Sequence, residues 1–323
     1  MNSHKNNNSY KKGKIIMRNI DIKNKDGLTE KEFLDSYIPG SYDRPSNTVD
    51  MLLFTVDDLP VDGKDPDKAL KMLLIKRGDH PYMGCYAIPG GFVNIDEALS
   101  TACYRELKEE TNIDSVYFEQ LKTFGDLVKR DPRMRVISIA YLALADKTNI
   151  KPIAGDDATF AQWFTVRKDF ISSDNSGIER VDFYNLTLVS DDGEVKIGYL
   201  VTERFIKNGI ISIKVPSYEP LVWSVDELAF DHIDEVYCAL ERLENKIEYT
   251  PIAFSLLPKY FTLREAQKLY EAILHLEKPL SRANFRRKIK KMVIEIDKEK
   301  TTAGRPATCY MFNENWEHSF LDE

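Results

Sequence analysis

The chain has 323 residues, 43% of them hydrophobic, and a formal net charge of −7. This length favours two domains with a connector, and this hydrophobic content excludes a largely disordered protein. The apolar runs are about half the roughly 20 residues of a transmembrane helix, and the N-terminus lacks the apolar stretch of a secretory signal. The four cysteines show no metal-ligand spacing. We therefore expect a reduced, cytoplasmic protein with no membrane partner.

The negative charge is unevenly distributed along the chain. Residues 258–305 contain 13 Lys and Arg against 6 Asp and Glu, a net of +7, so the remainder carries −14. A basic segment in an acidic protein is typical of a nucleic-acid-binding module, although a solvated surface gives the same composition. Charge alone leaves both interpretations open.

The N-terminal half shows a mixed helix and strand pattern. Residues 1–25 are polar, and we expect a disordered tail. Thr29 and Glu32 have capping-box spacing, which predicts a short helix to about Tyr37. Strands are predicted from β-branched and apolar runs, and a helix from one strongly helical stretch. The strands are 50–56, 70–75 and 135–144, and the helix is 96–111. The fold class is therefore α+β.

The predicted helix 96–111 carries three carboxylates at close spacing. Glu106, Glu109 and Glu110 stand at positions i, i+3 and i+4, so their side chains project from one helical face. Like charges at this spacing repel, and a divalent cation such as Mg²⁺ or Mn²⁺ would offset the repulsion. A solvent-exposed acidic face is the alternative. We expect these three residues to be metal ligands.

The string from Gly91 through Glu97 to the run Arg105–Glu110 resembles the Nudix box. Only Asn112 departs from it, where the box has Gly, and Asn tolerates the left-handed turn after a helix. The resemblance implies a Nudix α/β/α sandwich, here residues 26–168, and metal-assisted hydrolysis at phosphorus in which the same glutamates are catalytic. It also implies that Glu97 and Arg105 pair to hold the loop on the helix. Gly90 and Gly91 should let the backbone bend before that loop.

A connector is predicted after this domain. Residues 184–190 and 194–201 flank an Asp-Asp-Gly turn, which predicts a β-hairpin inserted within 169–222. Ser224 and Glu227 then have capping-box spacing, so a linker helix is predicted over 225–246. Its apolar residues at helical spacing are Leu228, Val236, Leu240 and Leu243.

The segment 223–323 combines this linker helix with a predicted winged helix-turn-helix. Thr262 and Glu265 cap a helix whose apolar face is Leu269, Ile273 and Leu276. Ser281 caps a second helix, with Phe285, Ile289 and Met292 inward and basic residues outward. Strands at 293–297 and 307–312 flank a basic wing at 298–306. In this layout the second helix enters the major groove, although an interaction module with a basic face remains an alternative. We expect DNA contacts from Arg282, Asn284, Arg286, Arg287, Lys290, Lys291 and Arg305.

Several shorter strings extend the resemblance to the Nudix-related transcriptional regulators. They are residues 42–46, 124–126, 130–133, 228–232 and 304–307. The resemblance implies a homodimer that controls NAD metabolism or sugar catabolism and senses ADP-ribose or another small ligand. Many members have lost hydrolysis.

Two functions therefore compete at this point. The first is a regulator that binds double-stranded operator DNA and senses a nucleotide sugar, as the basic helix and wing indicate. The second is a Mg²⁺-dependent ADP-ribose pyrophosphatase with an assembly domain, as the intact glutamates indicate. Both can hold together. The candidate phosphate ligands, which could equally be an exposed loop, are Arg77, Arg130, Arg133 and Arg135.

Overall fold

The computed structural model describes residues 22–59, 66–111, 116–146, 158–177, 179–302 and 305–316. The chain divides into two compact units, Met1–Arg44 and Pro45–Glu323. The first contains helix α1 (Glu30–Ser36) and the short 3₁₀ helix η1 (Pro39–Ser41). The predicted capping box is present, because the Thr29 hydroxyl accepts from the Glu32 amide and the Glu32 carboxylate accepts from the Thr29 amide. Most of the predicted tail lies outside the described residues.

The second unit is built on a mixed sheet, ten-stranded over the described residues, in the order β10-β9-β8-β7-β2-β1-β6-β5. Strand β1 (Ser46–Asp58) lies between β2 (Lys68–Arg77), to which it is antiparallel, and β6 (Val136–Leu144), to which it is parallel. The outer strand is β5 (Tyr117–Phe124). Two short strands, β3 (Tyr86–Ala87) and β4 (Gly90–Phe92), pair with β2 and β1. All three strands predicted here are present.

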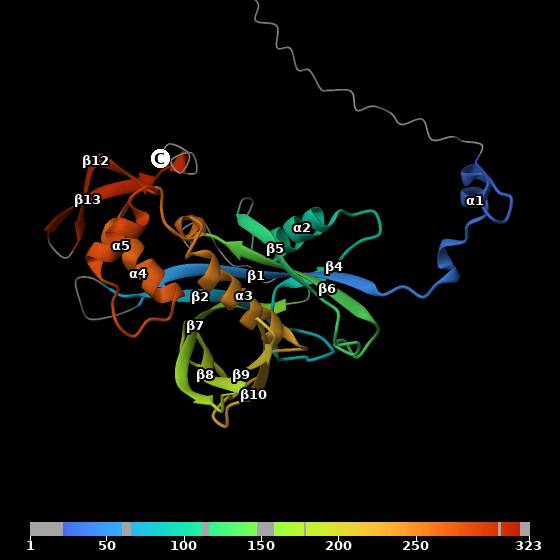
Figure 1. Cartoon of the computed structure of the whole chain (residues 1–323), viewed down its shortest axis with the longest axis horizontal. Coiled ribbons are helices and arrows are strands. Elements are labelled where there is room, and N and C mark those ends of the chain that lie inside the picture. Colours follow the sequence, from blue (N-terminus) through green and yellow to red (C-terminus); the bar gives the residue numbers. More distant parts are fainter. Residues whose placement is uncertain are drawn as a thin grey trace, which may run out of the picture. The chain divides into compact units, whose positions relative to one another are not determined.

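Helices cover both faces of this sheet (Figure 1). Side chains alternate along a strand, so the apolar run in β1 supplies two cores. Leu53 packs with Leu107 of α2 (Leu99–Thr111) on one face, and Phe54 belongs to the cluster around Leu240 of α3 (His232–Lys246) on the other. The predicted α/β/α sandwich is confirmed.

The predicted hairpin is part of the main sheet. The antiparallel strands β7 (Ala158–Asn175), β8 (Glu179–Ser190), β9 (Lys196–Asn208) and β10 (Ile211–Pro220) form a meander. Because β7 pairs with β2, this meander extends the Nudix sheet and is not an insertion. The expected boundary between 168 and 169 falls inside β7. A hairpin pattern alone does not reveal which sheet the strands join.

The linker helix begins later than predicted, at His232. The Ser224 hydroxyl does not cap a helix, since it accepts from the Gly198 amide and donates to the Asp226 carbonyl. The following segment instead runs along the sheet, where Leu228 forms a bridge with Tyr86. Phe230, with φ of 55°, is in the left-handed region. Contacts with the sheet override the local capping pattern here.

The winged helix contains α4 (Leu263–Ile273) and α5 (Arg282–Ile289). Its sheet, in the order β11-β13-β12, has the bounds Phe261–Thr262 for β11, Val293–Thr302 for β12 and Arg305–Phe312 for β13. Thr262 and Glu265 form the predicted capping box. Two expectations are wrong: Leu276 lies beyond α4 and is exposed, and the Ser281 side chain makes no capping bond. The wing strands are also longer than predicted.

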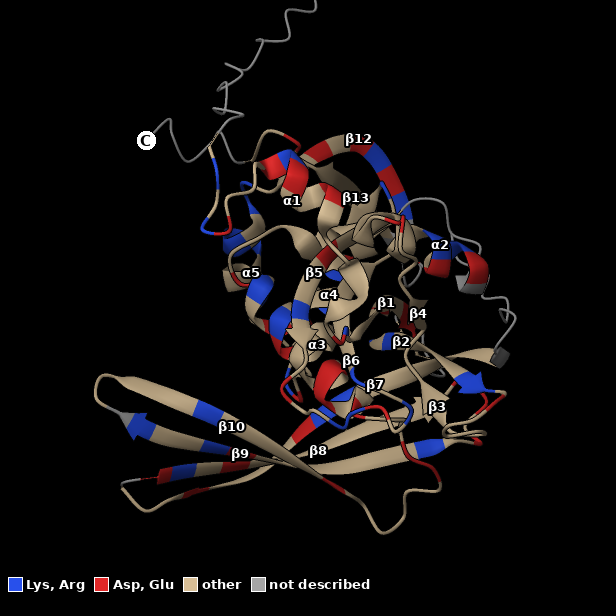
Figure 2. Cartoon of the chain, turned by 90° about the vertical axis from the view of Figure 1, so that its right-hand side faces the viewer, with Lys and Arg blue, Asp and Glu red and all other residues tan. Residues whose placement is uncertain are grey.

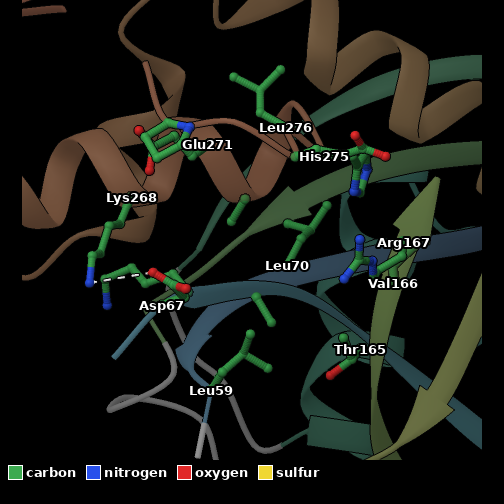
Figure 3. Close-up of a pocket in the computed structure, with 15 residues that line it drawn as sticks. Leu59, Asp67, Leu70, Thr165, Val166, Arg167, Lys268, Glu271, His275 and Leu276 are labelled. Carbon is green, nitrogen blue, oxygen red and sulfur yellow. Dashed lines mark ion pairs between the residues drawn. The ribbon is translucent and has the colours of Figure 1, made fainter. Parts of the chain in front are cut away.

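The winged helix packs directly on the Nudix sheet. Leu269 of α4 belongs to the same buried cluster as Leu240 of α3 and Leu70 of β2, and the 3₁₀ helix η3 (Ile252–Leu256) joins this cluster. A cavity of about 240 Å³ lies at the junction, lined by β2, β7 and α4 (Figure 3). At its edge the Lys268 ammonium donates to the Pro66 carbonyl at 2.7 Å and lies 3.5 Å from the Asp67 carboxylate. Among the described helices, none could span a membrane.

Candidate functional site

The loop before α2 is held by one arginine. Arg105 donates from Nε and Nη2 to the two carboxylate oxygens of Glu97, both at 2.9 Å, and from Nη2 to the Phe92 carbonyl. The hydrogen bonds from Arg105 lower the pKa of Glu97 to about 2, so this carboxylate remains charged. The expected pair between loop and helix is present.

The same guanidinium reaches the carboxylates that were expected to bind metal. Arg105 Nη1 lies 2.6 Å from Glu106 and 3.4 Å from Glu109. Burial raises the pKa of Glu106, although Arg105 opposes that shift. Carboxylate oxygens are the ligand type that Mg²⁺ and Mn²⁺ prefer. No group of three candidate ligands is found among the described residues, and the Glu110 side chain is outside them.

Gly90 and Gly91 occupy positions where a side chain would not fit. They lie in strand β4, paired with β1, and the bend expected from sequence is not their role there. A Cβ on Gly91 would collide with the carboxylate of Glu106, and one on Gly90 would collide with the carbonyl of Val49. The absence of side chains at these two positions lets α2, which carries the Nudix box, pack closely against the sheet.

A cavity of about 120 Å³ opens beside these glycines. Three of the four candidate arginines, Arg77, Arg130 and Arg133, line it. Arg135 is not among the lining residues, since its guanidinium donates to the carbonyls of Gly125 and Leu127. The structure thus brings together three candidates and leaves out the fourth.

Arg130 is buried and committed to protein partners. Its Nη2 lies 2.7 Å from Asp231 and 2.6 Å from Glu235, both at the beginning of α3. Its Nη1 donates to the Phe124 carbonyl. This side chain neutralises buried carboxylates and ties the β5–β6 loop to α3. Arg77 and Arg133 also have partners, since Arg77 Nε donates to the Pro81 carbonyl and Arg133 pairs with Asp131 at 2.7 Å, but both are more exposed than Arg130. The expectation of a phosphate contact therefore applies to these two.

Sequence reasoning missed the buried polar residues beneath the cavity. Asp50 accepts a hydrogen bond from the Ser138 hydroxyl, and burial raises the pKa of Asp50. Burial and the nearby Asp50 carboxyl raise the pKa of Glu235 well above its ordinary value. His232 Nδ1 accepts from the Ile88 amide at 3.0 Å, and burial lowers the pKa of this histidine to about 3. Two sequence signals were available: Asp50, a charged residue inside the apolar run of β1, and the string 228–232, which contains His232.

Arginine and aromatic side chains meet at the cavity. The Arg77 guanidinium stacks 5.1 Å from the ring centre of Phe230, and that of Arg133 lies 5.3 Å from the ring centre of Phe92. Tyr82 packs against Phe230 with ring centres 4.7 Å apart. Tyr82 and Phe230 both have positive φ, of 59° and 55°. Such backbone strain in bulky residues concentrates at functional sites. The arrangement offers positive charge for an anion and flat apolar faces for a planar ring.

The basic face of α5 is a candidate nucleic-acid interface, and its Lys and Arg are blue in Figure 2. Phe285, Ile289 and Met292 are buried as predicted. Lys288 turns inward to an ion pair with Glu248 at 2.8 Å. The exposed candidates are Arg282, Asn284, Arg286, Arg287 and Lys290; Lys291 is half-buried, and the Arg305 side chain lies outside the described residues.

Family comparisons agree with this architecture. Residues 59–174 match the NUDIX domain, and residues 253–312 match the NrtR DNA-binding winged helix domain. Fold and site together define a transcriptional regulator with a Nudix domain and a C-terminal winged helix. The "ADPR responsive transcriptional repressor NtrR" of Acinetobacter baylyi is 32% identical over 290 residues, covering 88% of each chain. The chain therefore belongs to the NrtR family of transcriptional repressors.

Two solved structures have the same arrangement. A MutT/nudix family protein from Enterococcus faecalis aligns with a TM-score of 0.63 and 29% identity, over 88% of this chain and 94% of that one. Shewanella oneidensis NrtR, complexed with a 27mer DNA, aligns with a TM-score of 0.51 and 25% identity, over 84% and 95%.

Proposed function

We propose that this chain is an ADP-ribose-responsive repressor, in which the Nudix cavity binds ADP-ribose or a related nucleotide sugar and α5 with the wing binds operator DNA. The observation that carries the proposal is that one continuous hydrophobic core connects two features. They are a cavity rich in arginine and aromatic side chains and an exposed basic helix. The name of the Acinetobacter relative and the DNA bound to the Shewanella protein support the same assignment.

The chemistry of the cavity suits a nucleoside diphosphate. Arg77 and Arg133 supply positive charge for the diphosphate. Phe92 and Phe230, beside those guanidinium groups, supply faces on which a base can stack. A free sugar has no negative charge for these arginines to bind.

Ligand-induced stabilisation tests the proposal. We expect ADP-ribose to raise the melting temperature of the full chain, because a ligand that binds only the native state stabilises it. AMP, ribose 5-phosphate and free pentoses should have smaller effects at equal concentration. ADP-ribose should also weaken binding of the chain to its operator duplex. No stabilisation by ADP-ribose, with stabilisation by a free pentose, would replace the nucleotide effector with a sugar.

Hydrolysis of ADP-ribose is a second candidate function, supported by the retained glutamates of the box. Glu106, Glu109 and Glu110 would hold a divalent cation, which when bound would neutralise phosphate oxygens and activate water. We expect AMP release in Mn²⁺ or Mg²⁺ and its loss in Glu109→Gln, with Glu194→Gln on an exposed turn as the control. A wild-type chain that binds ADP-ribose without releasing AMP acts as a sensor only.

A further inference from the structure

The histidine at the beginning of α3 has a fixed hydrogen-bonding state. His232 Nδ1 accepts from the Ile88 amide at 3.0 Å. Burial, together with the positive charges of Arg130 and Arg77, lowers the pKa of His232 to about 3, so the ring is neutral near neutral pH. A neutral imidazole carries one ring N–H, and the nitrogen that accepts a hydrogen bond cannot hold that hydrogen. The hydrogen of His232 is therefore on Nε2, which is a donor.

This Nε2 donor is unpaired within the described part of the chain. No group there accepts a hydrogen bond from it. His232 lines the Nudix cavity, and Nε2 is not among the enclosed polar atoms, so it retains access to solvent through the cavity. The Phe230 ring lies beside the imidazole, with ring centres 5.3 Å apart. Because polar groups in buried positions are nearly always paired, the acceptor for Nε2 is a bound ligand or solvent.

An acceptor lies close to this donor. Asp50 also lines the cavity, and its Oδ2 accepts from the Ser138 hydroxyl. Its other oxygen, Oδ1, faces Gly90 at the cavity wall, where an added Cβ would lie 2.6 Å from it. Ile88, which holds the His232 ring, is two residues from Gly90, a Cα separation of at most about 7 Å. The cavity wall therefore presents a donor and an acceptor near each other.

We propose that His232 Nε2 and Asp50 Oδ1 bind a ribose hydroxyl of the nucleotide ligand. This inference rests on the proposed function and names the part of the ligand that these two groups recognise. A hydroxyl both accepts and donates hydrogen bonds, so one hydroxyl, or two neighbouring hydroxyls of a ribose, satisfies both groups. A phosphate oxygen only accepts, and it would leave the carboxyl of Asp50 without a donor. The arginines of the cavity bind phosphate, and this pair binds the sugar.

Binding of ADP-ribose and two analogues tests the inference. Each analogue lacks the two vicinal hydroxyls of one of the two riboses, so the pair distinguishes the adenosine ribose from the terminal ribose. Affinities are measured by calorimetry on the full chain without divalent metal, so that no ligand is hydrolysed. We expect the wild-type chain to bind one of the analogues about 10- to 100-fold less tightly than ADP-ribose, because a buried donor and a buried acceptor would lose their partner.

Two substitutions of His232 separate the donor from the bond to Ile88. In His232→Asn the amide oxygen can accept from Ile88 in place of Nδ1, but no group replaces Nε2. In His232→Gln the side-chain amide can place a donor near the position of Nε2, but the acceptor at Nδ1 is lost. We expect His232→Asn to reduce the preference for ADP-ribose over the weaker analogue by about tenfold, and His232→Gln to retain most of it. A purely structural role for His232 predicts the opposite order.

The possible results separate this inference from the proposed function. A wild-type chain that binds ADP-ribose and both analogues equally overturns the inference and leaves ADP-ribose as the effector. The inference is also wrong if His232→Asn, folded by circular dichroism, keeps the full preference or weakens all three ligands by the same factor. A wild-type chain that binds none of the three ligands removes the proposed effector and this inference together.

Discussion

Arg130 Nη2 lies 2.6 Å from Glu235 Oε1, and both side chains are buried, with 4% and 0% of their surfaces exposed. The arginine comes from the loop between β5 and β6 that lines the Nudix cavity. The glutamate lies in the first turn of α3, the helix that leads to the winged helix. This ion pair therefore fixes the beginning of α3 beside the proposed effector cavity.

Replacing Arg130 with Met should destabilise the chain by about 3 to 5 kcal/mol, because the buried side chains of Asp231 and Glu235 would lose the guanidinium that binds both. Urea unfolding would measure this loss. Arg135→Met is the matched control, since that guanidinium donates only to two loop carbonyls. Its effect should be about 1 kcal/mol. Equal effects of the two substitutions would contradict a special role for the buried pair.

The pKa of Glu235 predicts a pH dependence of stability. The native pKa is raised well above the ordinary value of 4.5, so the folded chain retains a proton that the unfolded chain releases. The free energy of unfolding should therefore fall as pH rises from 4.5 through the raised native pKa. Glu235→Gln removes this titration and should lose less stability than wild type as pH rises above 4.5. Parallel pH profiles for wild type and Glu235→Gln would rule out this linkage; Glu194→Gln should follow wild type.

Local patterns predicted much of this structure. The Nudix box and the Thr262–Glu265 capping box are each confined to one short stretch of sequence. Their geometry therefore follows from one helix and its adjoining loop. The buried faces of α4 and α5 followed from helical periodicity. These features need no knowledge of how distant segments meet.

The features that were missed depend on distant contacts. Arg130 and Glu235 are 105 residues apart, and neither is unusual in its local sequence. Arg130 therefore resembled an exposed phosphate ligand until the fold placed two carboxylates around it. The late start of α3 has the same cause, because Leu228 and Phe230 are held by the sheet and cavity and not by helical neighbours.

Two arginines on α5 should contribute to DNA affinity. Arg286 and Arg287 are exposed on a helix whose other side is buried through Phe285 and Ile289. Arg286→Ala with Arg287→Ala should weaken operator binding and reduce the slope of log affinity against log salt by about 0.9 for each lost phosphate contact. Fluorescence anisotropy over a salt series would measure both quantities. The control is Lys288→Ala, since Lys288 pairs with Glu248, and a double variant with wild-type affinity would assign α5 to a protein partner.

Lys268 should couple effector binding to DNA binding. Its ammonium group joins α4 of the winged helix to the Pro66 carbonyl and the Asp67 carboxylate at the start of β2 (Figure 3). Lys268→Met keeps most of the side-chain volume but breaks this link. ADP-ribose affinity without DNA should remain unchanged, because the site of substitution is not among the residues that line the Nudix cavity.

The coupling itself is measured by titrating ADP-ribose with and without operator, using Glu109→Gln in every protein to prevent hydrolysis. In the Lys268-containing chain we expect operator to weaken ADP-ribose binding by about 5- to 150-fold, and linkage requires ADP-ribose to weaken operator binding by the same factor. In Lys268→Met, the effect of operator on ADP-ribose affinity and the effect of ADP-ribose on operator affinity should both fall toward a factor of one. Lys278→Met, at an exposed position after α4, should retain the coupling. Full coupling in Lys268→Met would assign transmission to α3, and equal affinities in the Lys268-containing chain would remove ADP-ribose as the signal.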